Sequence, residues 1–102
     1  MIKIINLDGI NLSARYINSD AKYTYLFIHG LQADKSIYNP FMERLKYKTN
    51  NSLLSVDLIG FGQSDKPKNF GYDLQDQLNL IIKLLSELEI KNLIIIGHSY
   101  GG

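Results

Sequence analysis

The sequence predicts an α/β fold, in which a sheet that is antiparallel at its first hairpin and parallel elsewhere is flanked by helices. Three observations lead to this prediction: a hairpin pattern at the N-terminus, short apolar segments that end in glycine-rich loops, and an amphipathic segment before the last of them. A hairpin followed by strand, helix, strand, helix and strand is typical of an α/β sheet that is mixed at one edge.

The first three strands are predicted over residues 2–7, 10–17 and 23–28. Asp8 and Gly9 separate the first two, and an Asp-Gly pair favours a type I′ turn because both central residues of that turn need a positive φ. Apolar and polar residues alternate along the second strand, which predicts one polar face. The third strand is rich in aromatic and β-branched residues.

The middle of the chain predicts a helix, a strand and a loop. Residues 37–45 favour a short helix with Ser36 as its N-cap. Pro40 lies inside this range, and the helix could begin later because proline is tolerated only near the first turn. Residues 53–56 predict the fourth strand, and residues 57–67 predict a glycine-rich loop closed by proline.

A second helix and a fifth strand complete the pattern. Asp73 is predicted to cap a helix that runs from residue 74 to about residue 88. Residues 93–96 are all apolar and predict a parallel strand that is covered on both faces. The apolar side chains of the helix recur at helical spacing and predict its buried face: Leu74, Leu78, Ile81, Leu85 and Leu88.

The composition excludes several classes of function. The 102 residues make one domain at most, with 45% hydrophobic and 21% charged residues and a net charge of +1, so we expect no nucleic-acid partner. Cysteine is absent and the two histidines lack ligand-like spacing, so we expect no disulfide, no metal site and no cofactor. No run of apolar residues approaches membrane-spanning length, and the N-terminus lacks a signal-peptide pattern. We therefore expect no membrane partner and a cytoplasmic location.

Residues 97–101 read Gly-His-Ser-Tyr-Gly and follow the fifth predicted strand directly. In a nucleophile elbow, G-x-S-x-G places the serine on a tight turn whose strained backbone projects the hydroxyl clear of the sheet. Side chains two residues before and two after the serine would collide across this turn, which Gly97 and Gly101 avoid. The pentapeptide matches by chance in roughly a few per cent of chains of this length, so the apolar strand before it is needed as context.

Three segments at the ends of predicted strands occur in a characteristic order. Residues 27–30 read Phe-Ile-His-Gly, residues 57–64 carry an aspartate, two glycines and a serine, and residues 97–102 contain the elbow. Together these segments resemble the N-terminal half of the α/β-hydrolase fold family, and the resemblance covers essentially the whole chain. It implies the strand order 1-2-4-3-5, with the first pair antiparallel and the rest parallel.

The resemblance assigns roles to individual residues by position. Ser99 corresponds to the nucleophile of the family. The resemblance also implies an oxyanion hole made of two backbone N–H groups, one from Tyr100 and one from Leu31 in the loop after the third strand. His29 and Gly30 are expected to shape this loop, because the histidine that acts as base in the family comes later in the chain.

The other motif residues are expected to support the site. Gly97, His98 and Gly101 shape the elbow, and the His98 side chain should point away from the nucleophile. Asp57 and Ser64 are expected to hold the glycine-rich loop through side-chain hydrogen bonds and to stand outside the catalytic triad.

The resemblance implies hydrolysis of an ester or related acyl bond in a small-molecule substrate, through an acyl-serine intermediate in the complete protein. Thioesterases, lipases, acyltransferases and carbon–carbon bond hydrolases share the serine elbow, whereas haloalkane dehalogenases and epoxide hydrolases use aspartate there. The triad of the family runs serine, acid, histidine, but only residues 100–102 follow Ser99. We therefore expect residues 1–102 to be a single partial domain that stops just after the elbow and is inactive alone.

Two other functions compete with this prediction. The chain could be a non-catalytic truncated fragment or binding piece that lacks the triad acid and histidine. It could also be a dinucleotide-binding module, since Gly60 and Gly62 begin a G-x-G-x-x-G pattern, but Asp65 replaces the third glycine and Pro67 follows. In the isolated 102 residues, the strand over residues 93–96 would form an apolar sheet edge without lysine or proline, because the next strand of the family's sheet is missing, and this predicts self-association.

Overall fold

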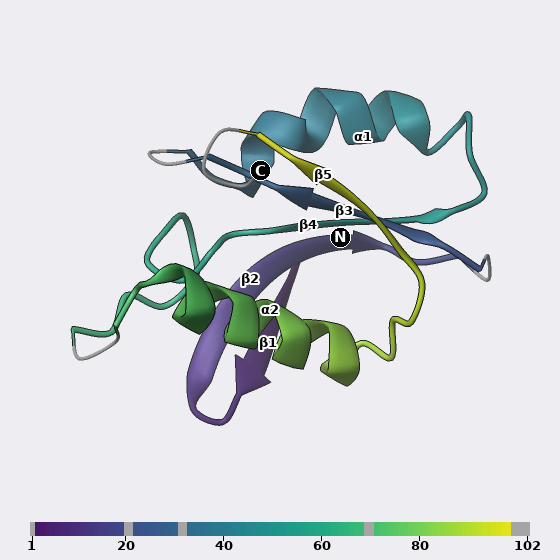
Figure 1. The fold of residues 1–102 in the computed structure, drawn as a ribbon. Helices are drawn as coiled ribbons and strands as arrows, with labels where there is room; N and C mark the ends of the chain where they lie inside the picture. The colour runs from purple at the N-terminus through teal and green to yellow at the C-terminus, as the bar shows by residue number, and fades with distance from the viewer. Residues whose placement is uncertain (1, 20–21, 31–32, 69–70, 99–102) are drawn as a thin grey trace.

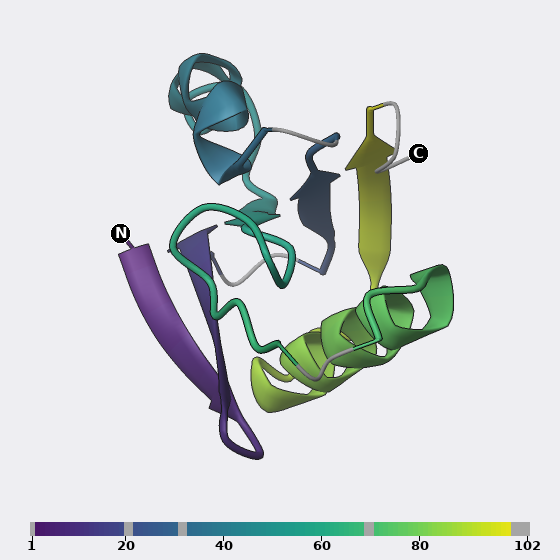
Figure 2. The same cartoon turned by 90° about the vertical axis from the view of Figure 1, so that its left-hand side faces the viewer.

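The computed structural model describes residues 2–19, 22–30, 33–68 and 71–98 (Figure 1). Within this part of the chain, five strands form one sheet in the order β1-β2-β4-β3-β5, and helices α1 and α2 lie on its opposite faces (Figures 1 and 2). The strands are β1 (Ile2–Leu7), β2 (Ile10–Ile17), β3 (Thr24–Ile28), β4 (Ser52–Val56) and β5 (Leu93–Gly97).

The strand order, the antiparallel first hairpin and the parallel pairing of later strands are confirmed. β1 and β2 are antiparallel, and β3 is parallel to both β4 and β5. β2 also runs antiparallel to β4, so it opposes both of its neighbours. Asp8 and Gly9 have φ values of 53° and 92°, as the predicted type I′ turn requires.

The first helical segment begins earlier than the sequence predicts. A 3₁₀ turn, η1 (Lys35–Tyr38), precedes α1 (Asn39–Leu45). The prediction of Ser36 as N-cap is wrong, because the Asp34 side chain accepts a 2.8 Å hydrogen bond from the Ser36 N–H. Hydrogen bonds from the Ser36 hydroxyl and N–H also lower the pKa of Asp34. Pro40 stands in the first turn of α1, where its missing N–H needs no partner.

The second helix, α2 (Leu74–Glu87), has the predicted cap but a different buried face. The Asp73 side chain accepts a hydrogen bond of 2.8 Å from the Asp76 N–H. Leu74 and Leu78 are exposed, so the prediction that they are core residues is wrong. Apolar side chains occupy more of the helix surface than the sheet can cover. The residues that are buried lie next to the predicted face: Gln77, Leu80, Ile81 and Leu84.

Alternate side chains of the central strands divide the core into two layers. Leu26, Leu54 and Val56 pack with the buried side chains of α2. Phe27 and Leu53 pack on the other face, with Tyr38 and Met42 of the η1–α1 segment. No helix among the described residues is long and apolar enough to cross a membrane.

Candidate active site

The ends of β3 and β5 bring two of the sequence motifs together. Ile28 pairs with Gly97 in the parallel register, and the His98 N–H donates a 3.3 Å hydrogen bond to the Ile28 carbonyl. Because carboxyl ends of parallel strands meet at one edge of a sheet, the loop after β3 and the turn after β5 start side by side (Figure 1). The predicted site residues Leu31, Ser99, Tyr100 and Gly101 lie outside the described residues.

His29 is fully buried and ties the end of β3 to the loop after β4. Its Nε2 accepts a hydrogen bond of 3.0 Å from the Leu58 N–H. A backbone N–H can only donate, so the ring proton lies on Nδ1, which is 2.7 Å from the Gly30 carbonyl oxygen. The Phe61 ring contacts the imidazole edge-on, with ring centroids 5.2 Å apart. Both ring nitrogens thus contact backbone groups, and the role of His29 in shaping an oxyanion loop stays a prediction.

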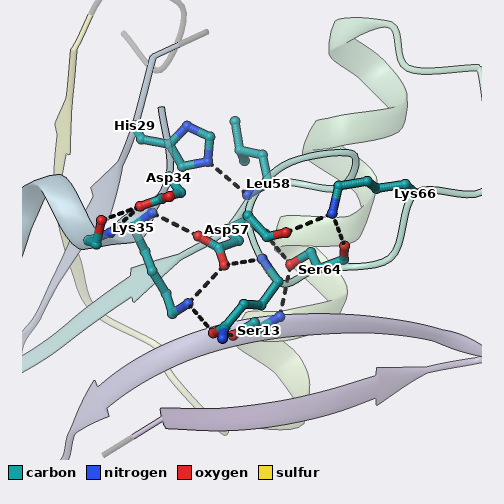
Figure 3. A network of polar contacts seen from close by, with 11 residues as sticks. Ser13, His29, Asp34, Lys35, Asp57, Leu58, Ser64 and Lys66 are labelled. Carbon is teal, nitrogen blue, oxygen red and sulfur yellow. Dashed lines mark hydrogen bonds and ion pairs between the residues drawn. The ribbon is translucent and has the colours of Figure 1, made fainter. Parts of the chain in front are cut away.

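Asp57 is the centre of a buried polar network (Figure 3). Its Oδ1 accepts a 2.7 Å hydrogen bond from the Lys35 N–H, and its Oδ2 accepts from the Lys35 ammonium and the Gln63 N–H, both at 2.8 Å. A Cβ on Gly62, whose φ is +52°, would lie 2.4 Å from this carboxylate. The loop therefore wraps closely around the aspartate, and the predicted role of Asp57 in holding the turn is confirmed.

Ser64 and Asp65 dock the same loop on backbone N–H groups at the edge of β2. The Ser64 hydroxyl donates a 2.6 Å hydrogen bond to the Asp57 carbonyl and accepts one of 2.8 Å from the Ser13 N–H. The Asp65 carboxylate accepts a 2.7 Å hydrogen bond from the Asn11 N–H. The loop therefore continues the hydrogen bonding along the edge of β2 beyond the residues that pair with β4, and the predicted role of Ser64 is confirmed.

The same contacts argue against a dinucleotide site. A phosphate-binding glycine loop presents free backbone N–H groups to the ligand. Here the N–H groups of Gly60, Phe61 and Ser64 donate to carbonyls of the loop itself. The Gln63 N–H donates to Asp57, and the Asp65 N–H donates to β2. This loop is therefore closed on itself and on β2.

Lys35 is the functional-site residue that sequence reasoning missed. Its side chain is only 7% exposed, and its ammonium bonds Asp57 Oδ2 and, at 3.1 Å, Gln63 Oε1. An aspartate at the end of a buried strand predicts a cationic partner, since buried charges are paired. The chain has many lysines, however, and sequence spacing alone does not select the one that the loop after β3 brings back to β4.

An apolar groove of about 460 Å³ lies between α2 and β5. Leu78 and Ile82 of α2 and Ile95 of β5 line it, and all three are exposed. Among the described strands, none pairs with the outer edge of β5 (Figure 2). The prediction that both faces of the fifth strand are covered is therefore wrong for this chain, whereas the predicted sheet edge is present.

The fold and the arrangement of strand-end motifs define a protein of the α/β-hydrolase class. The chain belongs to this family: the profile described as "Alpha/beta hydrolase family" matches residues 25–102. A Bacillus subtilis protein described as "Uncharacterized hydrolase YugF" is 29% identical over 101 residues, which are 99% of this chain and 36% of that protein.

Solved structures with the same fold act on different bonds. A membrane phospholipase A superposes with a TM-score of 0.90 at 27% identity, over 99% of this chain and 32% of its own. The haloalkane dehalogenase DatA from Agrobacterium tumefaciens C58 superposes with a TM-score of 0.86 at 27% identity, over 99% of this chain and 33% of its own. The chain thus spans about a third of the length of these relatives.

Proposed function

We propose that this chain carries the nucleophile and the oxyanion hole of a serine hydrolase that cleaves an ester or related acyl bond. The observation that carries the proposal is the pairing of Ile28 with Gly97, which starts the His29-Gly30 loop beside the elbow sequence. In that arrangement the serine of the elbow and a backbone N–H of the neighbouring loop can reach one carbonyl group.

The proposed reaction has two steps. The Ser99 oxygen attacks the carbonyl carbon of the substrate and gives its proton to a base, while the N–H groups of Leu31 and Tyr100 bind the negative carbonyl oxygen. The bond to the leaving alcohol then breaks, the alcohol takes a proton, and an acyl-serine remains. Water hydrolyses this ester to a carboxylic acid and restores Ser99.

Serine at position 99 supports acyl-bond hydrolysis over dehalogenation. Enzymes of this fold that cleave carbon–halogen bonds or epoxides use aspartate at the elbow, whereas the sequence here is Gly-His-Ser-Tyr-Gly. The likeness to a phospholipase A is in keeping with an ester substrate. The acid and the histidine of the triad are assigned to no residue of this chain, so we propose that residues 1–102 alone do not turn over an ester.

A fluorophosphonate probe followed by mass spectrometry tests the proposal on the hydrolase that contains this chain. We expect a single adduct on Ser99 that disappears in Ser99→Ala. Ser86→Ala is the matched control, because Ser86 is exposed on α2 and should leave labelling unchanged. Labelling at another residue, or labelling that survives Ser99→Ala, would contradict the assignment of the nucleophile.

A further inference from the structure

The loop after β3 is fastened at both ends to two consecutive residues of the loop after β4. At its start, His29 Nε2 accepts from the Leu58 N–H at 3.0 Å. At its end, the Lys35 N–H donates to Asp57 Oδ1 at 2.7 Å. His29 and Lys35, on either side of this loop, therefore bond adjacent residues at the start of the loop after β4, as Figure 3 shows.

The loop after β4 is itself a fixed support. Ser64 and Asp65 bind two separate N–H groups of β2, at 2.8 and 2.7 Å. The Asp57 carboxylate lies inside this loop and accepts from the Gln63 N–H as well as from Lys35. A displacement of His29 or Lys35 would therefore have to break contacts to a loop that is anchored to the sheet.

Stability alone does not require an ion pair at this place. Removing two charges from water carries a large desolvation cost, and replacing a buried ion pair by apolar residues of similar volume is often neutral or stabilising. Side-chain exposures of 7% for Lys35 and 1% for Asp57 put this pair in that class. The pair also fixes the orientation of the backbone at Lys35, because one carboxylate binds both the N–H and the ammonium of this residue.

We propose that Asp57 and Lys35 are positioning residues, which hold segment 30–34 so that the Leu31 N–H meets the negative oxygen formed during acyl transfer. This inference rests on the proposed function, because it gives the pair a task only if that loop serves an oxyanion. Neither side chain touches the substrate. The pair acts through the backbone of the loop, and it should therefore affect the transition state more than substrate binding.

The test compares three variants of the active hydrolase that contains this chain. Asp57→Asn keeps the shape and one oxygen acceptor but removes the charge. Lys35→Met keeps the backbone N–H that bonds Asp57 and removes only the ammonium. Asp8→Asn is the matched control: it makes the same chemical change at another ion-paired aspartate, but its carboxylate lies 3.4 Å from the Lys83 ammonium in the turn between β1 and β2. The maximal rate of each variant is divided by the concentration of Ser99 that reacts with a fluorophosphonate. This gives kcat per active site and excludes unfolded protein from the comparison.

We expect Asp57→Asn to lower kcat by about 10- to 100-fold with KM within about twofold, since loss of an oxyanion donor costs on the order of 10² to 10³ in rate. Lys35→Met should lower kcat by less, and Asp8→Asn should leave it nearly unchanged. Hydrogen exchange of the amides in segment 30–34 should accelerate in the first two variants and not in the third.

Three results would overturn the inference. Asp57→Asn or, if that variant does not fold, Lys35→Met could retain the full kcat per titrated site, which would make the pair purely structural while the proposed function stands. Asp8→Asn could lower kcat as much as Asp57→Asn. The unmodified hydrolase could lack a titratable Ser99, and then the proposed function itself fails, whatever the variants do.

Discussion

The polar loop after β4 and the apolar groove beside β5 are completed to different degrees by this chain. In the loop, the Asp57 carboxylate, the Lys35 ammonium and the Ser64 hydroxyl all have partners within 3.1 Å. In the groove, Leu78 and Ile95 remain exposed on a helix and on a strand edge.

This difference between the two regions reflects the different requirements of polar and apolar groups. A buried charge or hydroxyl needs a partner at a defined distance and angle, so its partners have to be encoded with it. An apolar surface needs only area, which any apolar surface can provide. Changes in the polar loop should therefore cost more stability than changes in the apolar groove.

Removing the Asp57 carboxylate should produce the largest loss of stability. Asp57→Ala leaves the buried Lys35 ammonium and the Gln63 N–H without their shared acceptor. Breaking a buried pair in this way costs about 3–5 kcal/mol. Urea denaturation checks the free energy of unfolding, and a loss below about 1 kcal/mol would show that the network contributes little to stability.

Gly62→Ala should destabilise the protein more than Gly9→Ala, although both glycines have positive φ. A Cβ on Gly62 would meet the Asp57 carboxylate at 2.4 Å, whereas a Cβ on Gly9 has no atom within 4 Å. We expect a cost of about 2–4 kcal/mol at Gly62, from backbone strain plus overpacking, and about 1–2 kcal/mol at Gly9, from strain alone. Equal melting temperatures for the two variants would show that the loop moves away from the aspartate at little cost.

We propose that copies of the 102-residue chain associate through the outer edge of β5. The exposed residues of this strand are apolar, and none of residues 93–97 carries a charge that would disfavour pairing with another strand. Ile95→Lys should weaken this association by about tenfold or more, which corresponds to at least about 1.4 kcal/mol. Ile4→Lys is the matched control, because Ile4 is 58% exposed on the opposite edge strand and Ile95 is 60% exposed. Analytical ultracentrifugation checks both variants. A monomeric parent chain, or an equal effect of Ile4→Lys, would contradict the proposed interface.

The smallest effect is expected at the cap of η1. Hydrogen bonds from Ser36 lower the pKa of Asp34 below its ordinary value of 3.8. The ionised carboxylate therefore stabilises the folded state above about pH 4, and this contribution is lost as the pH falls through the lowered pKa. Asp34→Ala should cost about 0.5–1 kcal/mol at neutral pH and less in acid. Thermal denaturation at pH 7 and pH 3 checks this, and a cost that does not shrink in acid would contradict the role of the charge.

The sequence predicts well what neighbouring residues determine. Asp8-Gly9 specifies its turn and Asp73 its cap, because in each case the interacting backbone lies within three residues. Which face of α2 is buried depends instead on the position of the sheet, and Leu74 and Leu78 are exposed for that reason.

The candidate site divides in the same way. The role of Asp57 follows from a motif at a strand end, and the structure bears it out, whereas the role of His29 in the oxyanion loop stays a prediction. Lys35 reaches Asp57 across a sequence separation of 22 residues. Asp34 rather than Ser36 caps the 3₁₀ turn η1. Both contacts arise from the path of the loop after β3, which local sequence preferences do not determine.

The most direct test of the account is a crystal structure of the hydrolase that contains this chain after reaction with a fluorophosphonate. The account predicts phosphorus bonded to the Ser99 oxygen, with the phosphoryl oxygen about 2.7–3.1 Å from the backbone nitrogens of both Leu31 and Tyr100. A phosphoryl oxygen that contacts neither nitrogen, or an adduct on another residue, would contradict it.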